Sequence, residues 1–70
     1  MVNERLKELR KTNNVTQKHV ANSIDIAVRH YQDLEYGKVK PSHDTIIALA
    51  NFFGVSTDYL LGLTDNPKRL

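Results

Sequence analysis

The chain contains no cysteine, only two prolines and three glycines, and no long apolar run among its 70 residues. Without cysteine, neither a disulfide nor a thiolate metal site can stabilise the fold, so stability must come from helix packing. The lack of disulfides also fits a reducing cytoplasm, where we expect the protein to reside. No segment approaches the roughly 20 apolar residues that span a bilayer, and residues 1–11 are amphipathic rather than signal-like, so we expect no membrane association.

The formal net charge is +2, and the basic excess lies in the first 40 residues. That part has eight Lys and Arg side chains against five Asp and Glu, whereas the remainder has two against three. A polyanion, if one binds, would therefore meet the N-terminal half. An excess this small is also typical of an ordinary solvated surface, so it does not identify a partner.

Seventy residues form one small domain, which buries only about 60% of the surface that its unfolded chain exposes. Such a domain has little room for an enclosed active site. His19, His30 and His43 lack the spacing of metal ligands, and no Ser/His/Asp set or pair of carboxylates can be assigned to a pocket. We therefore expect no catalytic activity, metal, cofactor or small-molecule ligand.

Apolar periodicity and capping residues predict an all-α fold of five short helices. The first covers about residues 3–13, the second covers residues 17–23 after the cap residue Thr16, and the third runs from about Val28 to a stop at Gly37. The last two begin after the cap residues Ser42 and Ser56 and end at Gly54 and Gly62. The sequence thus divides into a domain of residues 3–62 and a short C-terminal tail, residues 63–70, which we expect to be frayed.

The second and third helices are joined by a turn of only three or four residues, so they must cross steeply. Ala21 is small enough to let the two backbones approach where they cross. The apolar residues of this segment are Val20, Ile24, Ile26, Tyr31 and Leu34. This spacing is typical of a helix-turn-helix.

Four sequence blocks in order resemble the DNA-binding domains of lambdoid-phage repressors and Cro proteins, also called xenobiotic-response-element-like regulators. The blocks are RLKELR, TQKHVA, LEYGKVKPS and IIALANFFGVSTDYLLG, and the resemblance covers residues 3–62. It implies a lambda-repressor-like fold whose second and third helices form the helix-turn-helix. The chain departs from the family at Asp25, where Gly is usual, and at Ala27, where Ser or Thr is usual. Asp tolerates a positive φ, but Ala27 cannot cap the third helix through its side chain.

The resemblance implies that the third helix enters the major groove of double-stranded DNA. The expected base contacts come from Val28, Arg29, His30, Gln32 and Asp33. Arg29 can donate two hydrogen bonds to guanine, Val28 can touch a thymine methyl, and Asp33 can accept from cytosine or hold Arg29 in position. A solvated polar side chain is the simpler alternative for each, above all for His30 and Gln32.

Phosphate contacts are expected at both flanks of that helix, because backbone contacts fix the register without reading sequence. The candidates are Gln17, Lys18, Arg10, Tyr36, Lys38, Lys40 and His43. By resemblance, Arg10 also forms an orienting ion pair with Glu35. We expect only a place on a solvated face for Arg5, Lys7 and Lys11.

One recognition helix covers few base pairs, so the resemblance implies a homodimer on two half-sites about 34 Å apart. We expect its interface among apolar residues late in the chain, for each of which a place in the core is an equal alternative: Phe52, Val55, Tyr59, Leu60 and Leu63. The function implied is a sequence-specific transcriptional regulator, a repressor of a palindromic operator. The alternative is a protein-interaction module of the same fold, such as an antitoxin or a co-regulator.

Overall fold

The computed structural model describes residues 2–69, and this range contains five helices and no strand. The helices are α1 (Val2–Thr12), α2 (Gln17–Ser23), α3 (Val28–Glu35), α4 (His43–Phe53) and α5 (Thr57–Leu60). The expected all-α fold class is confirmed, and α1 begins and ends one residue earlier than its periodicity suggested. No helix in residues 2–69 combines the length and the apolar character that a membrane span requires.

Hydroxyl side chains begin three of the helices, as their positions predicted. Thr16, Ser42 and Ser56 each accept a hydrogen bond from the backbone N–H three residues further on, at 3.0, 3.2 and 3.0 Å. Each bond satisfies one of the N–H groups that a helix start leaves without a partner. Ala27 has the same extended backbone, with φ −65° and ψ 143°, but no side-chain bond caps α3.

The helices end where the backbone turns to positive φ. Asn14 has φ 55° after α1, and Gly54 has φ 69° after α4. Gly37, at φ 78°, also faces the side chain of Asn3, and a Cβ at Gly37 would lie 3.1 Å from Asn3 Nδ2. Gly37 therefore lets the chain turn after α3 and pass close to α1 at the same point.

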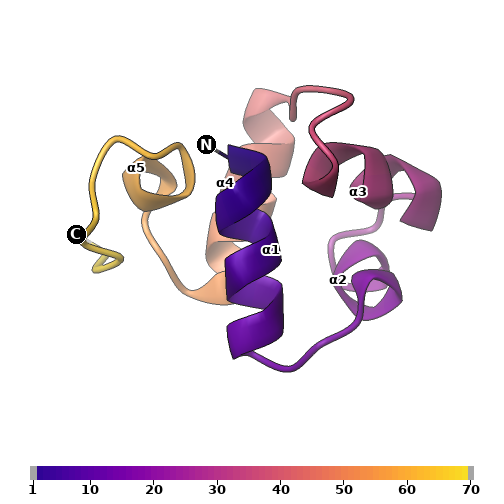
Figure 1. The fold of residues 1–70 in the computed structure, drawn as a ribbon, viewed down its shortest axis with the longest axis horizontal. Helices are drawn as coiled ribbons and strands as arrows, with labels where there is room; N and C mark the ends of the chain where they lie inside the picture. Colours follow the sequence, from indigo (N-terminus) through magenta and orange to yellow (C-terminus); the bar gives the residue numbers. More distant parts are fainter. Residues whose placement is uncertain (1, 70) are drawn as a thin grey trace.

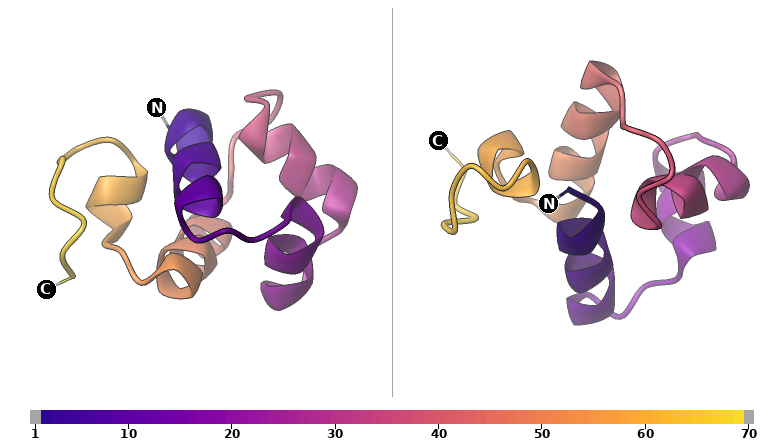
Figure 2. Two further views of the ribbon diagram at one scale, coloured as in Figure 1. Left: turned by 60° about the horizontal axis from the view of Figure 1, so that its bottom comes forward. Right: turned by 45° about the horizontal axis from the view of Figure 1, so that its top comes forward.

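In the ribbon, α1 lies across α4 at the centre of the molecule, with α2 and α3 on one side and α5 with the C-terminal segment on the other (Figure 1). The two further views show the same arrangement (Figure 2). The buried hydrophobic core draws on all five helices and consists of Leu6, Val20, Ala21, Tyr31, Leu34, Ile46, Leu49, Ala50 and Leu60. A single small core thus joins the helix-turn-helix to the rest of the chain.

The segment of residues 63–70, which we expected to be frayed, makes hydrogen bonds to the rest of the domain within its described part, residues 63–69, and Leu70 lies outside the described residues. The backbone N–H of Ser56 donates to the carbonyl of Pro67 at 3.0 Å, and Arg69 donates to the carbonyl of Ala50 and to the side chain of Asn51. These bonds hold the segment against the end of α4, and their partners lie too far apart in sequence for local patterns to reveal them.

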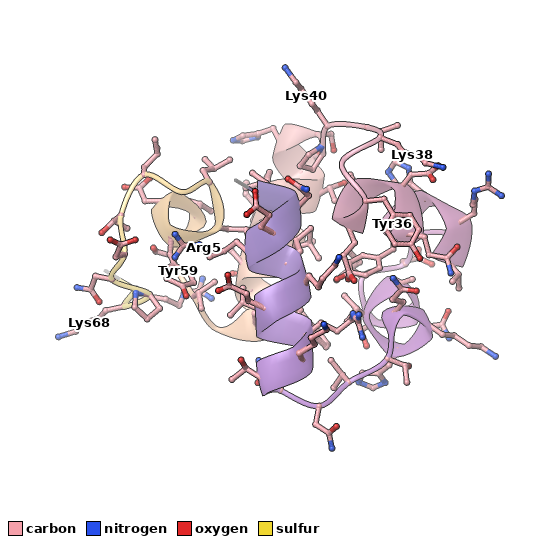
Figure 3. The ribbon with its side chains drawn as sticks, in the orientation of Figure 1. Arg5, Tyr36, Lys38, Lys40, Tyr59 and Lys68 are labelled. Atoms are coloured by element: carbon pink, nitrogen blue, oxygen red, sulfur yellow. The ribbon has the colours of Figure 1, made fainter. Side chains whose placement is uncertain are left out.

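Arg5 contributes to the same attachment and does not merely decorate a solvated face. Its guanidinium carbon lies 4.0 Å from the centroid of the Tyr59 ring, and its Nη2 lies 3.5 Å from Asp65 Oδ1. Figure 3 shows Arg5 and Tyr59 side by side between α1 and α5. A cation over an aromatic face is attracted to it, so this contact joins α1 to α5.

The uncapped start of α3 predicts that Ala27→Ser stabilises the domain. The new hydroxyl can accept the backbone N–H of His30, as Thr16 does for α2, so the free energy of unfolding should rise by about 1 kcal/mol. Urea denaturation measures the change. Ala27→Val, which adds bulk but no acceptor, is the control and should not stabilise. An unchanged urea midpoint for Ala27→Ser would contradict this account of the cap.

Candidate DNA interface

The turn between α2 and α3 is closed by backbone hydrogen bonds and one left-handed residue. Asp25 has φ 60°, which confirms that Asp supports the turn in place of Gly. The N–H of Ile26 donates to the carbonyl of Ala21 at 3.0 Å, and Ala21 is fully buried. A larger side chain at Ala21 would have to displace its packed neighbours at this turn.

The outer face of α3 presents most of the side chains expected to read bases. The Arg29 side chain is 81% exposed, and its Nε lies 3.6 Å from Asp33 Oδ1, one turn further along. His30 is exposed, Gln32 is half-buried, and Val28 is half-buried because it packs against the core. Asp33 thus holds Arg29 electrostatically while leaving its guanidinium accessible.

Behind that face, Glu35 is buried and paired with Arg10, as the resemblance implied. Arg10 Nε lies 2.9 Å from Glu35 Oε2, and Arg10 Nη2 lies 2.9 Å from Glu35 Oε1. Only 1% of the Glu35 side chain is exposed. Arg10 Nη1 also donates to the carbonyl of Val15, so one guanidinium connects α1, the loop before α2 and the end of α3.

Two glutamines extend this network, although nothing in the sequence linked them to it. Gln17 Nε2 donates to Glu35 Oε1 at 3.2 Å, and Gln32 Nε2 donates to Gln17 Oε1 at 3.3 Å. Gln17 and Gln32 are 15 positions apart and uncharged, so neither helical spacing nor charge complementarity signals their contact. Gln17 and Gln32, which we assigned to phosphate and base contacts respectively, therefore belong to one hydrogen-bonded group.

The electrostatics of the network follow from burial and pairing. Burial alone would raise the pKa of Glu35, but hydrogen bonds, first from Arg10, lower the pKa below its ordinary value. The bond to Glu35 raises the pKa of Arg10 in turn. Burial, reinforced by the nearby Glu35 carboxylate, raises the pKa of Tyr31, whose enclosed hydroxyl has no partner in hydrogen-bond geometry among the described residues. Glu35 is thus an ionised carboxylate at neutral pH.

The expected phosphate contacts lie at both flanks of α3. Tyr36, Lys38 and Lys40 are exposed on or beside the loop after α3, and Figure 3 shows both lysines extending outward there. His43 begins α4, is exposed and lies 3.9 Å from the Asp44 carboxylate. Gln17 and Lys18 begin α2, near Arg10.

Within the described residues, no group of three or more His, Asp or Glu side chains is placed to hold a metal ion.

The structure separates the residues assigned to the dimer interface. Leu60 belongs to the core and is fully buried, and Val55 is only 6% exposed, so neither side chain is available for a contact between subunits. Phe52 and Tyr59 are half-buried, and Phe52 stacks edge-on against His19 and Phe53. Leu63, 73% exposed, is the accessible member of the set. The sequence could not make this division, because all five side chains have an apolar body that either a core or an interface can bury.

A family model described as a helix-turn-helix domain matches residues 3–66. The chain belongs to this family. The family expected from the sequence blocks is thereby confirmed, and α2 and α3 are its helix-turn-helix.

This helix-turn-helix domain is 42% identical over 64 residues to YobD of Bacillus subtilis (strain 168), an uncharacterized HTH-type transcriptional regulator, covering 91% of the chain and 57% of YobD. It is 38% identical over 66 residues to the HTH-type transcriptional regulator ImmR of the same organism, covering 94% of the chain and 52% of ImmR. The chain therefore spans about half the length of these relatives.

The fold is similar to that of the P22 c2 repressor, whose crystal structure is a complex with the synthetic operator 9T. The two superpose with a TM-score of 0.81 at 22% sequence identity, covering 86% of this chain and 91% of the repressor chain. The lambda-repressor-like fold class is thereby confirmed.

The buried pair predicts that Arg10→Met destabilises the domain by about 3 kcal/mol at pH 7, because it leaves the Glu35 carboxylate buried without its cation. Urea denaturation of Arg10→Met and of the double variant Arg10→Met/Glu35→Met measures this. The double variant should recover most of the loss, since no charge is then stranded. Equal destabilisation of both variants would contradict the account.

The Arg10–Glu35 pair makes the free energy of unfolding depend on pH. The folded pKa of Glu35 is below its unfolded value, so the stabilisation is complete above the unfolded pKa and is lost as pH falls through the folded pKa. Without Arg10, burial raises the pKa of Glu35 above its ordinary value. The difference between wild type and Arg10→Met should therefore begin to shrink at a pH above 4.5, as the variant's Glu35 takes up a proton, and should shrink further until pH passes the lowered pKa of the wild type. A difference that stays constant down to pH 3 would contradict this assignment.

Proposed function

We propose that this helix-turn-helix domain binds duplex DNA in a sequence-specific manner, with α3 in the major groove. The observation that carries the proposal is the exposed Arg29 guanidinium, held by Asp33 on a helix whose inner side is fixed by the buried Glu35. Arginine in such a setting can donate two parallel hydrogen bonds to guanine O6 and N7. A rigid helix presents those donors in one orientation, which sequence discrimination requires.

Transcriptional regulation is the activity proposed for the protein. YobD and ImmR are named transcriptional regulators, and the P22 c2 repressor was solved with its operator. We assign this chain the same role, as a repressor that occupies a palindromic operator. No enzymatic activity is part of the proposal.

The remaining side chains of the proposed interface contact either bases or phosphates, according to their position. On α3, Val28 keeps enough exposed surface to touch a thymine methyl, and His30 lies on the exposed face beside Arg29. The phosphate contacts divide between two strands of the duplex. Arg10, Gln17 and Lys18 would meet one strand, with Tyr36 beside them, and Lys38, Lys40 and His43 would meet the other.

We propose that two copies bind together through a symmetric contact centred on Leu63. Its exposure of 73% makes it the accessible apolar side chain of the five first assigned to this contact. Leu61, 37% exposed, lies two residues earlier and extends the apolar surface. A contact of this size buries little area, so the dimer should form weakly without DNA.

Selection of bound duplexes from a random pool tests the proposed function. The expected result is an inverted repeat whose half-sites are about 34 Å apart, one DNA turn. A single half-site would overturn the dimer while leaving DNA binding intact. Failure to enrich any duplex at low salt, together with capture of a protein partner that survives high salt, would favour the protein-interaction module instead.

Arg29→Ala should relax the preference for one G·C pair by about 1–3 kcal/mol, because the bidentate donor is lost. Binding to the selected duplex and to its single-base variants measures the change. Lys68→Ala is the control, since Lys68 extends from the opposite end of the molecule from Lys38 and Tyr36 (Figure 3). An unchanged preference in Arg29→Ala would remove Arg29 from the base readers.

A further inference from the structure

Gln32 is tethered on α3 by a hydrogen bond to α2. Its Nε2 donates to Gln17 Oε1 at 3.3 Å, and Gln17 Nε2 donates to Glu35 Oε1 at 3.2 Å. Glu35 is held in turn by Arg10. A continuous row of hydrogen bonds therefore runs from the buried carboxylate to the outer face of α3.

The buried carboxylate fixes the direction of every bond in this row. An ionised carboxylate accepts hydrogen bonds and cannot donate them, so Gln17 must turn its amino group toward Glu35. The carbonyl of Gln17 then faces Gln32, so Gln32 must donate a hydrogen bond to it from its own amino group. Both amides are thus oriented before any ligand arrives.

This orientation restricts base reading by Gln32, because it fixes the direction of the amide before DNA binds. A glutamine that recognises adenine presents its carbonyl and its amino group together to the base edge. In Gln32 one amide hydrogen already bonds to Gln17, so a bidentate contact to adenine would have to use the second hydrogen and the carbonyl while the amide stays held toward α2. Gln17 also keeps its second amide hydrogen free, and Gln17, unlike Gln32, lines the open cleft between α1 and the start of α2.

We propose that Gln32 is a positioning residue that acts through Gln17, aiming the free amide hydrogen of Gln17 at a DNA backbone phosphate. The inference rests on the proposed function and replaces the expectation that Gln32 reads a base. Gln32 then contributes to affinity for every sequence alike, because phosphate contacts carry no sequence information.

A double-mutant cycle tests this with Gln32→Met, which keeps the length of the side chain but removes the amide, Gln17→Met, and both together. Each single variant should bind the selected duplex roughly 2- to 10-fold more weakly, as expected for one hydrogen bond. The double variant should be no weaker than Gln17→Met, because Gln32 acts only through Gln17. Circular dichroism at the binding temperature verifies that each variant is folded.

A second readout separates positioning from base reading. The duplex motif selected by Gln32→Met should equal that of the wild type, whereas Arg29→Ala should lose its preference at one position. Additive losses in the cycle, or a changed base preference in Gln32→Met, would overturn the inference and leave the proposed function standing. A wild-type chain that binds no duplex would overturn both.

The cleft itself supplies an independent observation about two lysines. It has a volume of about 580 Å³, and Lys7, Arg10 and Lys11 on α1 line it together with Gln17 and Tyr36. The charge of Arg10 is balanced by Glu35. Lys7 and Lys11 are one helical turn apart on the same face and form no ion pair among residues 2–69. They give the cleft a net positive charge.

The geometry also points to a DNA phosphate site in this cleft, with Lys7 and Lys11 as its cationic side chains. The cleft adjoins the C-terminal end of α3 through Glu35 and the following Tyr36, so a duplex held by α3 brings one strand alongside it. This assignment again rests on the proposed function, and it replaces the expectation that these lysines only decorate the surface.

The salt dependence of binding tests the two lysines. Lys7→Gln and Lys11→Gln should each reduce the slope of log K against log salt concentration by about one, because each lost contact releases one counterion fewer. Lys68→Gln removes the same charge from the far end of the molecule and should leave the slope unchanged. Equal slopes for all three variants would overturn the site, while retained sequence-specific binding would show that the proposed function stands.

Discussion

The arrangement of the first three helices depends on one buried carboxylate, that of Glu35. Burying an ionised group is costly unless a partner and hydrogen bonds compensate it, so α1 and α3 can pack only where Arg10 reaches Glu35. Gln17 brings the start of α2 to the same oxygen. Three helices are therefore held at one point, and alternative packings would leave a charge inside the protein without its partner.

A buried ion pair that holds helices together at one point suits a domain too small for a large core. The buried apolar residues account for the attraction between the helices, but apolar contacts alone tolerate shifts in register. The Arg10–Glu35 pair adds little net stability compared with an apolar pair of the same shape, and its contribution is to select one arrangement. In the proposed function, that arrangement aims Arg29 and the donors of the cleft at the same duplex.

The two ends of the molecule have different physical character. The end formed by α2, α3 and the following loop carries Lys18, Arg29, Lys38 and Lys40. At the other end, Arg5 stacks on Tyr59 and pairs with Asp65, and Leu63, two residues before Asp65, is exposed. In the proposed function, this separation lets one end meet the DNA while the other remains available for a second subunit.

The sequence by itself determined the local structure: the five helices, the caps at Thr16, Ser42 and Ser56, and the turn at Asp25, because these depend on neighbouring residues. Its resemblance to a known family also anticipated the Arg10–Glu35 pair. Only the tertiary structure decided that Gln32 bonds to Gln17, that Leu60 belongs to the core while Leu63 does not, and that the C-terminal segment is attached. Each of these depends on contacts between distant positions, and the short-range periodicity and capping rules of a sequence do not encode such distances.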